Sequence, residues 1–124
     1  MIQLRTLLKI ADNSGAKHAV MIGMAKKGNK KYAYVGDVIN VVVREAIPYG
    51  QVKKSEKAVA VVVRTRKEKR RSDGSYIRFD DNAAVILQGP DSREPKGTRI
   101  FGPIAKEVKD RGFSKIASLA EEIY

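Results

Sequence analysis

The sequence predicts a mainly β fold, a barrel or a sandwich, and three observations support this prediction. Short apolar runs rich in β-branched residues alternate with turn residues over most of the chain. The connections between these runs are too short for crossover helices, so neighbouring strands should be mostly antiparallel. No internal repeat or linker interrupts the 124 residues, and we therefore expect one domain over residues 1–124.

Six runs are predicted to form strands, and turn residues separate most of them. The first run closes at residues 12–15, whose Asp-Asn-Ser-Gly sequence favours a turn. The third is interrupted at residues 36–37 (Gly-Asp), and residues 48–50 (Pro-Tyr-Gly) precede the fourth. Residues 73–74 (Asp-Gly) suit a tight hairpin turn that requires a positive φ. The runs cover residues 4–11, 17–25, 32–46, 57–65, 76–80 and 83–88.

The C-terminal portion, about residues 90–124, has a different character. Residues 90–98 contain two prolines and are predicted to form an irregular loop. Gly102-Pro103 is expected to open a short helix, because proline suits the first helical position, and Gly112 can end it. Residues 113–119 are predicted to form a final strand, in which Phe113, Lys115 and Ala117 alternate with Ser114, Ile116 and Ser118.

The region around residues 60–86 carries the strongest functional signal. An apolar run, Ala60–Val63, leads into a segment with six basic residues against one acid, Glu68, and the chain then turns at Asp73-Gly74. The sequence therefore predicts a buried strand that continues into a protruding basic β-hairpin. A cationic cluster held away from the core is suited to a polyanion. The six basic residues are Arg64, Arg66, Lys67, Lys69, Arg70 and Arg71.

The overall charge agrees with a polyanionic partner. The formal net charge is +11 and the sequence pI is about 10.0. Nucleic acid is the first candidate and an anionic membrane surface the main rival. The longest apolar run, Ala58–Val63, is far shorter than the roughly 18 residues of a membrane helix. Because no helix-turn-helix or zinc-finger pattern is present, RNA recognised through phosphate and 2′-hydroxyl groups fits better than a DNA groove.

Other basic segments could extend such a surface. A loop with Lys26, Lys27, Lys30 and Lys31 precedes Tyr32 and Tyr34, whose rings could stack on unpaired bases or simply pack on the barrel. In the C-terminal portion, Arg93, Arg99 and Arg111 could lie on the same face. The pair at residues 53–54 (Lys-Lys), with Glu56 nearby, is expected to be solvated.

The sequence offers little for catalysis. The single histidine, His18, has no cysteine or second histidine nearby and is expected to be structural. Asp80 and Asp81 would point to opposite faces of a strand, so we expect them to pair with arginines rather than share a substrate. Without cysteine, a nucleotide-binding motif or a secretion signal, we expect an intracellular protein with no catalytic, cofactor or metal site.

Four ordered segments resemble the family of the universal large-subunit ribosomal protein fourteen, in its bacterial or organellar form. The resemblance runs from Met1 to the last few residues. It implies a five-stranded antiparallel β-barrel, with a C-terminal loop region that carries short helices. The segments are Ala11–Ala16, Val35–Ile39, the stretch from Ala60 to Ile86 with Asp73-Gly74, Phe79 and Asn82, and Gly97–Pro103.

The resemblance also implies partners. A structural protein of this family binds large-subunit (23S-type) rRNA, contacts neighbouring large-subunit proteins and contributes to intersubunit bridges with small-subunit rRNA, in the cytoplasm or in an organelle. It can also dock the ribosome silencing factor, here through Thr98, Arg99 and Lys115. Departures at Lys96 and Ser114, and in the tail, affect this docking surface. The expected rRNA-binding residues are Lys26, Lys27, Lys30, Lys31, Arg64, Arg66, Lys67, Lys69, Arg70, Arg71, Arg78 and Arg93.

Two other classes of function compete with this interpretation. A free translation factor or RNA chaperone on a small barrel would bind many single strands weakly and would not remain with one particle. A small enzyme would require two converging titratable groups with perturbed pKa values in one pocket.

Overall fold

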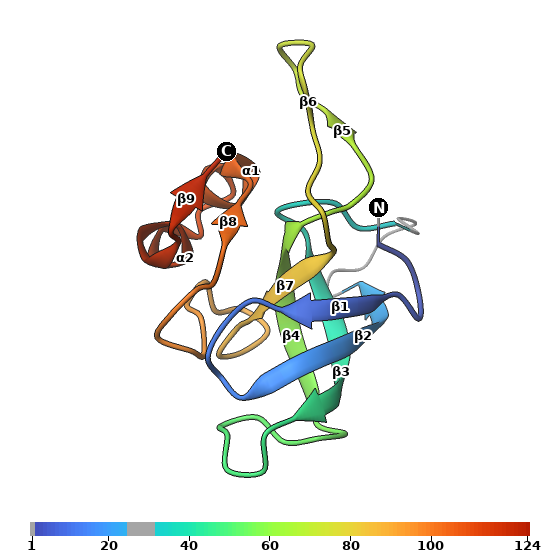
Figure 1. The fold of residues 1–124 in the computed structure, drawn as a ribbon, viewed down its shortest axis with the longest axis vertical. Coiled ribbons are helices and arrows are strands. Elements are labelled where there is room, and N and C mark those ends of the chain that lie inside the picture. The colour runs from blue at the N-terminus through green and yellow to red at the C-terminus, as the bar shows by residue number, and fades with distance from the viewer. Residues whose placement is uncertain (1, 25–31) are drawn as a thin grey trace.

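Five strands close into a barrel, as the computed structural model, which describes residues 2–24 and 32–124, shows (Figure 1). The ring order is β1-β2-β3-β4-β7, which confirms the predicted five-stranded barrel. Each of these strands lies within one of the runs predicted from sequence, apart from a one-residue extension at the start of β2. The strands are β1 (Leu7–Ile10), β2 (Ala16–Met24), β3 (Val38–Ala46), β4 (Lys57–Arg64) and β7 (Ala83–Ile86).

One pairing departs from the antiparallel expectation. Four neighbouring pairs in the ring are antiparallel, whereas β1 and β7 are parallel, with Lys9 opposite Ala83 and Ile10 opposite Ala84. The chain passes through three other barrel strands between β1 and β7, so no short turn constrains their relative direction. The parallel pair is therefore the seam that closes the barrel.

The barrel strands differ in how many faces they bury. Strand β1 alternates exposed and buried residues, as expected where one face meets solvent. In contrast, Ala60–Val63 of β4 and Ala83–Ile86 of β7 are buried without interruption. Their inward side chains join the barrel core, and their outward side chains join a second apolar cluster. The continuous apolar runs in the sequence therefore mark the strands that are covered on both faces.

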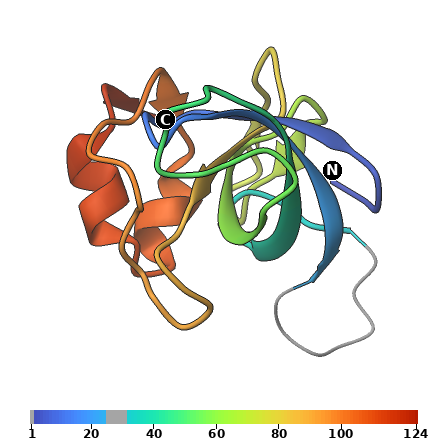
Figure 2. The ribbon, with the colours of Figure 1, turned by 90° about the horizontal axis from the view of Figure 1, so that it is seen from below.

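The C-terminal segment (residues 100–124) supplies this cover. It contains β8 (Pro103–Ile104), α1 (Lys106–Asp110), α2 (Ser114–Leu119) and β9 (Glu122–Ile123), and β8 pairs in parallel with β9. Figure 2 shows both helices against one side of the barrel. Their buried side chains meet Val61, Val63 and Val85 in the second cluster. No helix within the described residues is long and apolar enough to span a membrane.

Two predictions for this segment were wrong in detail. Residues 113–119, predicted as a strand, contain α2. Phe113, Ile116 and Ala117 are its buried anchors, and their i, i+3, i+4 spacing suits a helix face against the barrel better than the alternation suits a strand. Pro103 does not open a helix either, because it lies in β8 and α1 begins at Lys106.

The arm (residues 65–82) connects β4 to β7 and protrudes from the barrel (Figure 1). Its strands β5 (Lys69–Arg70) and β6 (Tyr76–Ile77) pair antiparallel, which confirms the predicted hairpin. Gly74 at the tip has φ of 88°, as the Asp-Gly turn predicted. The arm leaves the barrel beside the C-terminal segment, so residues of both line the space between them.

Candidate nucleic-acid interface

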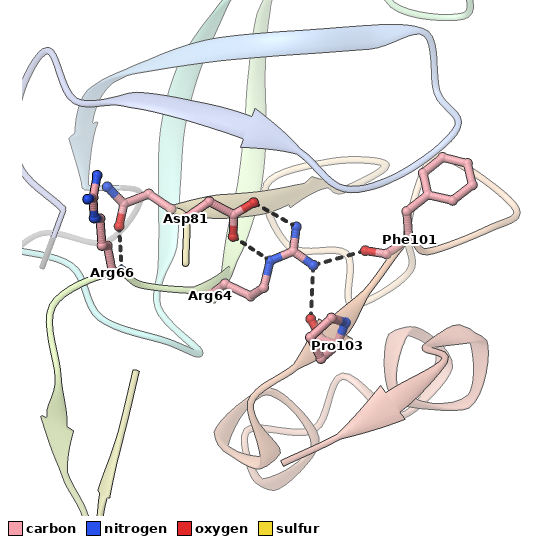
Figure 3. A network of polar contacts seen from close by, with 6 residues as sticks. Arg64, Arg66, Asp81, Phe101 and Pro103 are labelled. Carbon is pink, nitrogen blue, oxygen red and sulfur yellow. Dashed lines mark hydrogen bonds and ion pairs between the residues drawn. The ribbon is translucent and has the colours of Figure 1, made fainter. Parts of the chain in front are cut away.

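The exposed cations of the arm form the candidate interface. Arg66, Lys67 and Arg70 are exposed, and so is Arg78 on the returning leg. The ammonium group of Lys67 pairs with its neighbour Glu68 at 3.1 Å, which leaves it at the surface. The main-chain N–H of Arg66 donates to Asn82 Oδ1 at 2.8 Å and ties the two legs together at the base of the arm (Figure 3). These four side chains can meet a phosphate backbone without unfolding the arm.

Arg64, by contrast, is only 5% exposed, although it was predicted to contact rRNA. Its Nε donates to Asp81 Oδ1 at 2.9 Å, and its Nη1 donates to the carbonyl oxygens of Phe101 and Pro103, both at 3.0 Å (Figure 3). The guanidinium group therefore connects the base of the arm to the C-terminal segment and cannot reach a phosphate. The sequence predicted that Asp80 and Asp81 pair with arginines, and this prediction is confirmed for Asp81.

Arg71 has a similar anchoring position near the tip of the arm. Its Nη2 and Nε donate to Glu107 of α1 at 3.0 and 3.4 Å, and Nη2 also donates to the carbonyl oxygen of Tyr124. Only 15% of the Arg71 side chain and 17% of the Glu107 side chain are exposed. Of the six basic residues in the predicted cluster, Arg64 and Arg71 thus hold the arm in place.

The remaining lysine of the cluster is partly engaged by an aromatic ring. The Lys69 ammonium group lies 5.1 Å from the ring centroid of Tyr34, a favourable cation–π distance. Tyr34 was a candidate for base stacking, and Lys69 now lies over its ring. Tyr32 is exposed. The predicted basic-loop residues Lys26, Lys27, Lys30 and Lys31 lie outside the described residues.

The expected contacts in the C-terminal portion are exposed but differ in their surroundings. The guanidinium group of Arg93 lies 5.3 Å from the Phe113 ring centroid, and its Nη1 donates to the carbonyl oxygen of Arg111. Thr98 and Arg99 are exposed on the loop before the C-terminal segment, and Lys115 is exposed on α2. Arg111 donates to Asp37 at 3.2 Å, so this arginine joins α1 to the barrel.

Asn13 positions the exposed Thr98-Arg99 dipeptide, a role that the sequence reasoning missed. Its Oδ1 accepts from the main-chain N–H groups of Thr98 and Arg99 at 2.7 and 3.0 Å, and its Nδ2 donates to Thr98 Oγ1 at 2.9 Å. A Cβ on Gly97 would lie 2.6 Å from Asn13 Oδ1, so a larger residue there would displace the Asn13 amide from these bonds. Ala11–Ala16 and Gly97–Pro103 are both among the segments that resemble the family. Their joint occurrence was the one sign in the sequence that they could contact each other.

Asp12, beside Asn13, is a buried carboxylate with a full set of donors. It accepts from the main-chain N–H and the hydroxyl of Ser14 at 3.1 and 2.6 Å, and from the main-chain N–H of Ile86 at 3.0 Å. Burial raises the pKa of the Asp12 carboxyl above its ordinary value, and the hydrogen bonds from Ser14 and Ile86 oppose this shift. The carboxyl joins the β1–β2 turn to β7 and has a structural role.

Catalytic chemistry finds little support in the described residues. His18 is partly exposed and its Nδ1 lies 3.2 Å from Glu45 Oε2, so its predicted structural role stays a prediction. Among residues 2–24 and 32–124, no three His, Asp or Glu side chains gather closely enough to hold a metal ion. The expected absence of an enzyme activity thus stays a prediction from the residues.

The whole chain matches one known family. The sequence model described as ribosomal protein L14p/L23e covers residues 1–124. This is a family of structural ribosomal proteins and not a class of enzymes. Membership supports a structural role in the large ribosomal subunit, with ribosomal RNA and ribosomal proteins as partners. The barrel, the basic arm and the full-length match together show that the chain belongs to the ribosomal protein L14p/L23e family.

Proposed function

We propose that the arm binds large-subunit rRNA directly through Arg66, Lys67, Arg70 and Arg78. The observation that carries this proposal is the division of the arm's cations. Arg64 and Arg71 are held by carboxylates, whereas these four side chains are exposed. Each phosphate that they neutralise releases condensed counterions, which favours binding. The arm thus brings positive charge to the RNA while its base stays fixed on the barrel.

A second surface is proposed for bridging and for protein partners. Thr98 and Arg99 are held by Asn13, and exposed Lys115 lies on α2. Ile100 and Ile116 beneath them share the second apolar cluster, so loop and helix have one support. We assign small-subunit rRNA, neighbouring large-subunit proteins and the ribosome silencing factor to this surface. Its firm support suits a contact that must form and release without refolding.

The arm can be tested with a triple substitution, Arg66→Ser, Lys67→Ser and Arg70→Ser, which leaves both anchoring arginines in place. The variant should fold normally, yet bind large-subunit rRNA more weakly. The slope of log affinity against log salt should become shallower by about two, because each lost phosphate contact removes about 0.7–0.9. Filter binding over a range of salt concentrations measures both the affinity and the slope.

A matched control comes from the β3–β4 connection and the first residue of β4, at the other end of the barrel (Figure 1). Lys53, Lys54 and Lys57 are exposed, and their substitution by serine removes the same charge as the arm variant. This control should retain most of the parent slope. If both variants lost affinity equally, net charge and not the arm would account for binding.

Particle association separates a resident ribosomal protein from a free RNA-binding factor. Tagged protein from a lysate should sediment with the large subunit in stoichiometric amounts and remain there after a high-salt wash. Release by modest salt would favour the free translation factor or RNA chaperone. A double substitution, Arg99→Gln and Lys115→Gln, should keep the large-subunit association and reduce subunit joining, which a light-scattering assay can follow.

A further inference from the structure

A depression lies between the arm and the C-terminal segment, and its volume is about 700 Å³. The returning leg of the arm lines it through residues 76–81, and the C-terminal segment lines it through residues 101–103 and Tyr124. Arg64 and Asp81 also line it, but they are paired with each other. A volume of this size is within the range of pockets that hold small organic ligands.

Exposed aromatic side chains gather at this depression. Tyr76, Phe101 and Tyr124 all line it, and they are 64%, 47% and 55% exposed. Among the described residues, the other exposed aromatic side chains are those of Tyr32 and Tyr49. Three of the five exposed aromatic side chains of the described residues thus line one hollow, which makes the hollow a candidate binding site.

The aromatic residues are also held firmly by their main chains. The Phe101 N–H donates to the carbonyl oxygen of Ala11 at 2.6 Å, and its own carbonyl accepts from Arg64 at 3.0 Å. The Tyr124 N–H donates to the carbonyl oxygen of Ile104 at 2.9 Å, and its own carbonyl accepts from Arg71. The main chain that carries Phe101 and Tyr124 is therefore fixed before any ligand arrives, which reduces the entropy lost on binding.

The charges at the depression favour an anion. Lys9 and Arg78 line it and are both exposed, and the charge of Arg78 contributes to the lowered pKa of the Glu68 carboxyl. Arg70 lies directly opposite Tyr76 in the arm, so both side chains project from the same face of the hairpin. The lining also contains Asp80, whereas Asp81 is paired with Arg64. The positive charges of Lys9 and Arg78 therefore outnumber the negative charge of Asp80.

We propose that this depression holds one unpaired RNA nucleotide, with its base against the aromatic rings and its phosphate near Lys9 and Arg78. This inference rests on the proposed role of the arm in rRNA binding. Every base has a π-face, so aromatic stacking tolerates any sequence, while the flanking cations favour the backbone. An apolar peptide would use the rings but would gain nothing from the exposed cations.

The test compares two labelled six-nucleotide RNAs, hexauridylate and the same backbone without bases. Fluorescence anisotropy measures the affinity of each for the full-length protein at low salt. The parent should prefer hexauridylate, whereas Phe101→Leu and Tyr76→Leu should each weaken its binding about tenfold and leave binding of the baseless strand unchanged. Leucine retains apolar bulk at these exposed positions, so circular dichroism should show an unchanged fold.

Two control variants match these substitutions. Tyr49→Leu changes the most exposed aromatic residue, at 87%, which lies in the β3–β4 connection, and should leave both affinities unchanged. Arg78→Gln should weaken both RNAs equally, because it removes a phosphate contact and not a stacking surface. Lys53→Gln removes an equal charge remote from the depression and should have a smaller effect than Arg78→Gln on either RNA.

The outcomes separate this inference from the role proposed for the arm. Equal affinity of the parent for both RNAs would overturn the nucleotide site, even if the arm variant still lost its salt slope. The same holds if Phe101→Leu bound hexauridylate like the parent yet left the large subunit on washing, since the depression would then face a protein. If the triple arm variant kept the affinity and salt slope of the parent, the proposed role of the arm would be wrong. The preference of the parent for hexauridylate over the baseless strand would still report on the nucleotide site.

Discussion

The base and the exposed face of the arm use the same residue type for opposite purposes. Arg64, at the point where the arm leaves the barrel, is buried and donates hydrogen bonds to Asp81 and to two main-chain carbonyl groups. Arg66, two residues later, has an exposed side chain, and its main-chain N–H donates a hydrogen bond to Asn82. Farther along, Arg70 is exposed and Arg71 is held by Glu107.

This contrast shows that a basic run is not one functional unit. Arg70 and Arg71 are successive residues of the hairpin, so their side chains point to opposite faces, one toward solvent and one toward the protein. Arg64 and Arg66 differ for another reason, because β4 ends at Arg64 and the chain leaves the barrel there. The cations that meet the protein find carboxylates and main-chain carbonyls and fix the direction of the arm. Arg66, Lys67 and Arg70 remain exposed and can meet a polyanion. Neutralising phosphate and positioning the arm therefore depend on different residues within one segment.

The largest expected effect is on folding, from Arg64→Met. Methionine fills similar space but leaves Asp81 without its cation and the carbonyl groups of Phe101 and Pro103 without donors. We expect the free energy of unfolding to fall by about 3 kcal/mol. Urea denaturation measures this loss. The matched control is Arg66→Met, which changes an exposed side chain and should shift stability by less than about 0.5 kcal/mol. Equal losses of unfolding free energy in both variants would show that Arg64 does not stabilise the base of the arm more than the exposed Arg66 does.

A smaller effect is expected at the partly covered pair of Arg71 and Glu107. Arg71→Gln and Glu107→Gln should each destabilise by about 1–2 kcal/mol, because the neutral partner leaves the remaining charge in a mostly buried setting. The double variant should be less destabilised than the sum of the single variants. Additive losses in thermal unfolding would mean that the two side chains do not depend on each other. Hydrogen exchange in residues 69–77 should rise in all three variants.

Two Asp-x-Ser turns extend the comparison to carboxylates. Asp12 and Asp73 each accept from the main-chain N–H and hydroxyl of the serine two residues later. Burial raises the pKa of Asp12, whereas the hydrogen bonds from Ser75 lower the pKa of exposed Asp73. Carboxyl NMR titration should find Asp12 titrating at higher pH than Asp73. The reverse order would mean that local hydrogen bonding outweighs burial.

The raised pKa of Asp12 has a consequence for stability. Just above the ordinary pKa of an aspartate, the folded protein still binds a proton at Asp12 that the unfolded chain has released. The contribution of Asp12 to stability therefore falls as pH rises through this interval, and it levels off above the folded pKa. Asp12→Asn should remove this slope in unfolding experiments between mildly acidic and neutral pH. An unchanged slope would assign the dependence to other carboxyl groups.

The smallest effect on stability is expected from the triple arm variant. Arg66, Lys67 and Arg70 are exposed, so their replacement by serine should change the free energy of unfolding by less than about 0.5 kcal/mol in total. The same substitutions should produce the largest change in the salt dependence of RNA binding. A loss of stability similar to that of Arg64→Met would show that these side chains also hold the arm.

Local sequence patterns predicted the barrel strands and the hairpin, while the packing of the C-terminal segment was harder to predict. The Asp-Gly turn and the flanking runs were sufficient for the arm because hairpin pairing is local. Residues 113–119 were predicted as a strand, although the i, i+3, i+4 spacing of Phe113, Ile116 and Ala117 fits a helix, and these residues pack against β4 and β7 as one helical face. Likewise, the parallel pairing of β1 with β7 joins residues more than 70 positions apart, which no local pattern reports.

The sequence by itself determined the barrel strands, the protruding hairpin, the surplus of positive charge and the resemblance to the family that residues 1–124 match. Only the tertiary structure decided which cations are exposed, because Glu107 and Tyr124 reach Arg71 from a distant part of the chain and the carbonyl groups of Phe101 and Pro103 reach Arg64. Burial and pairing depend on such approaches, which composition and local periodicity do not encode. For the same reason, the sequence did not predict the depression between the arm and the C-terminal segment.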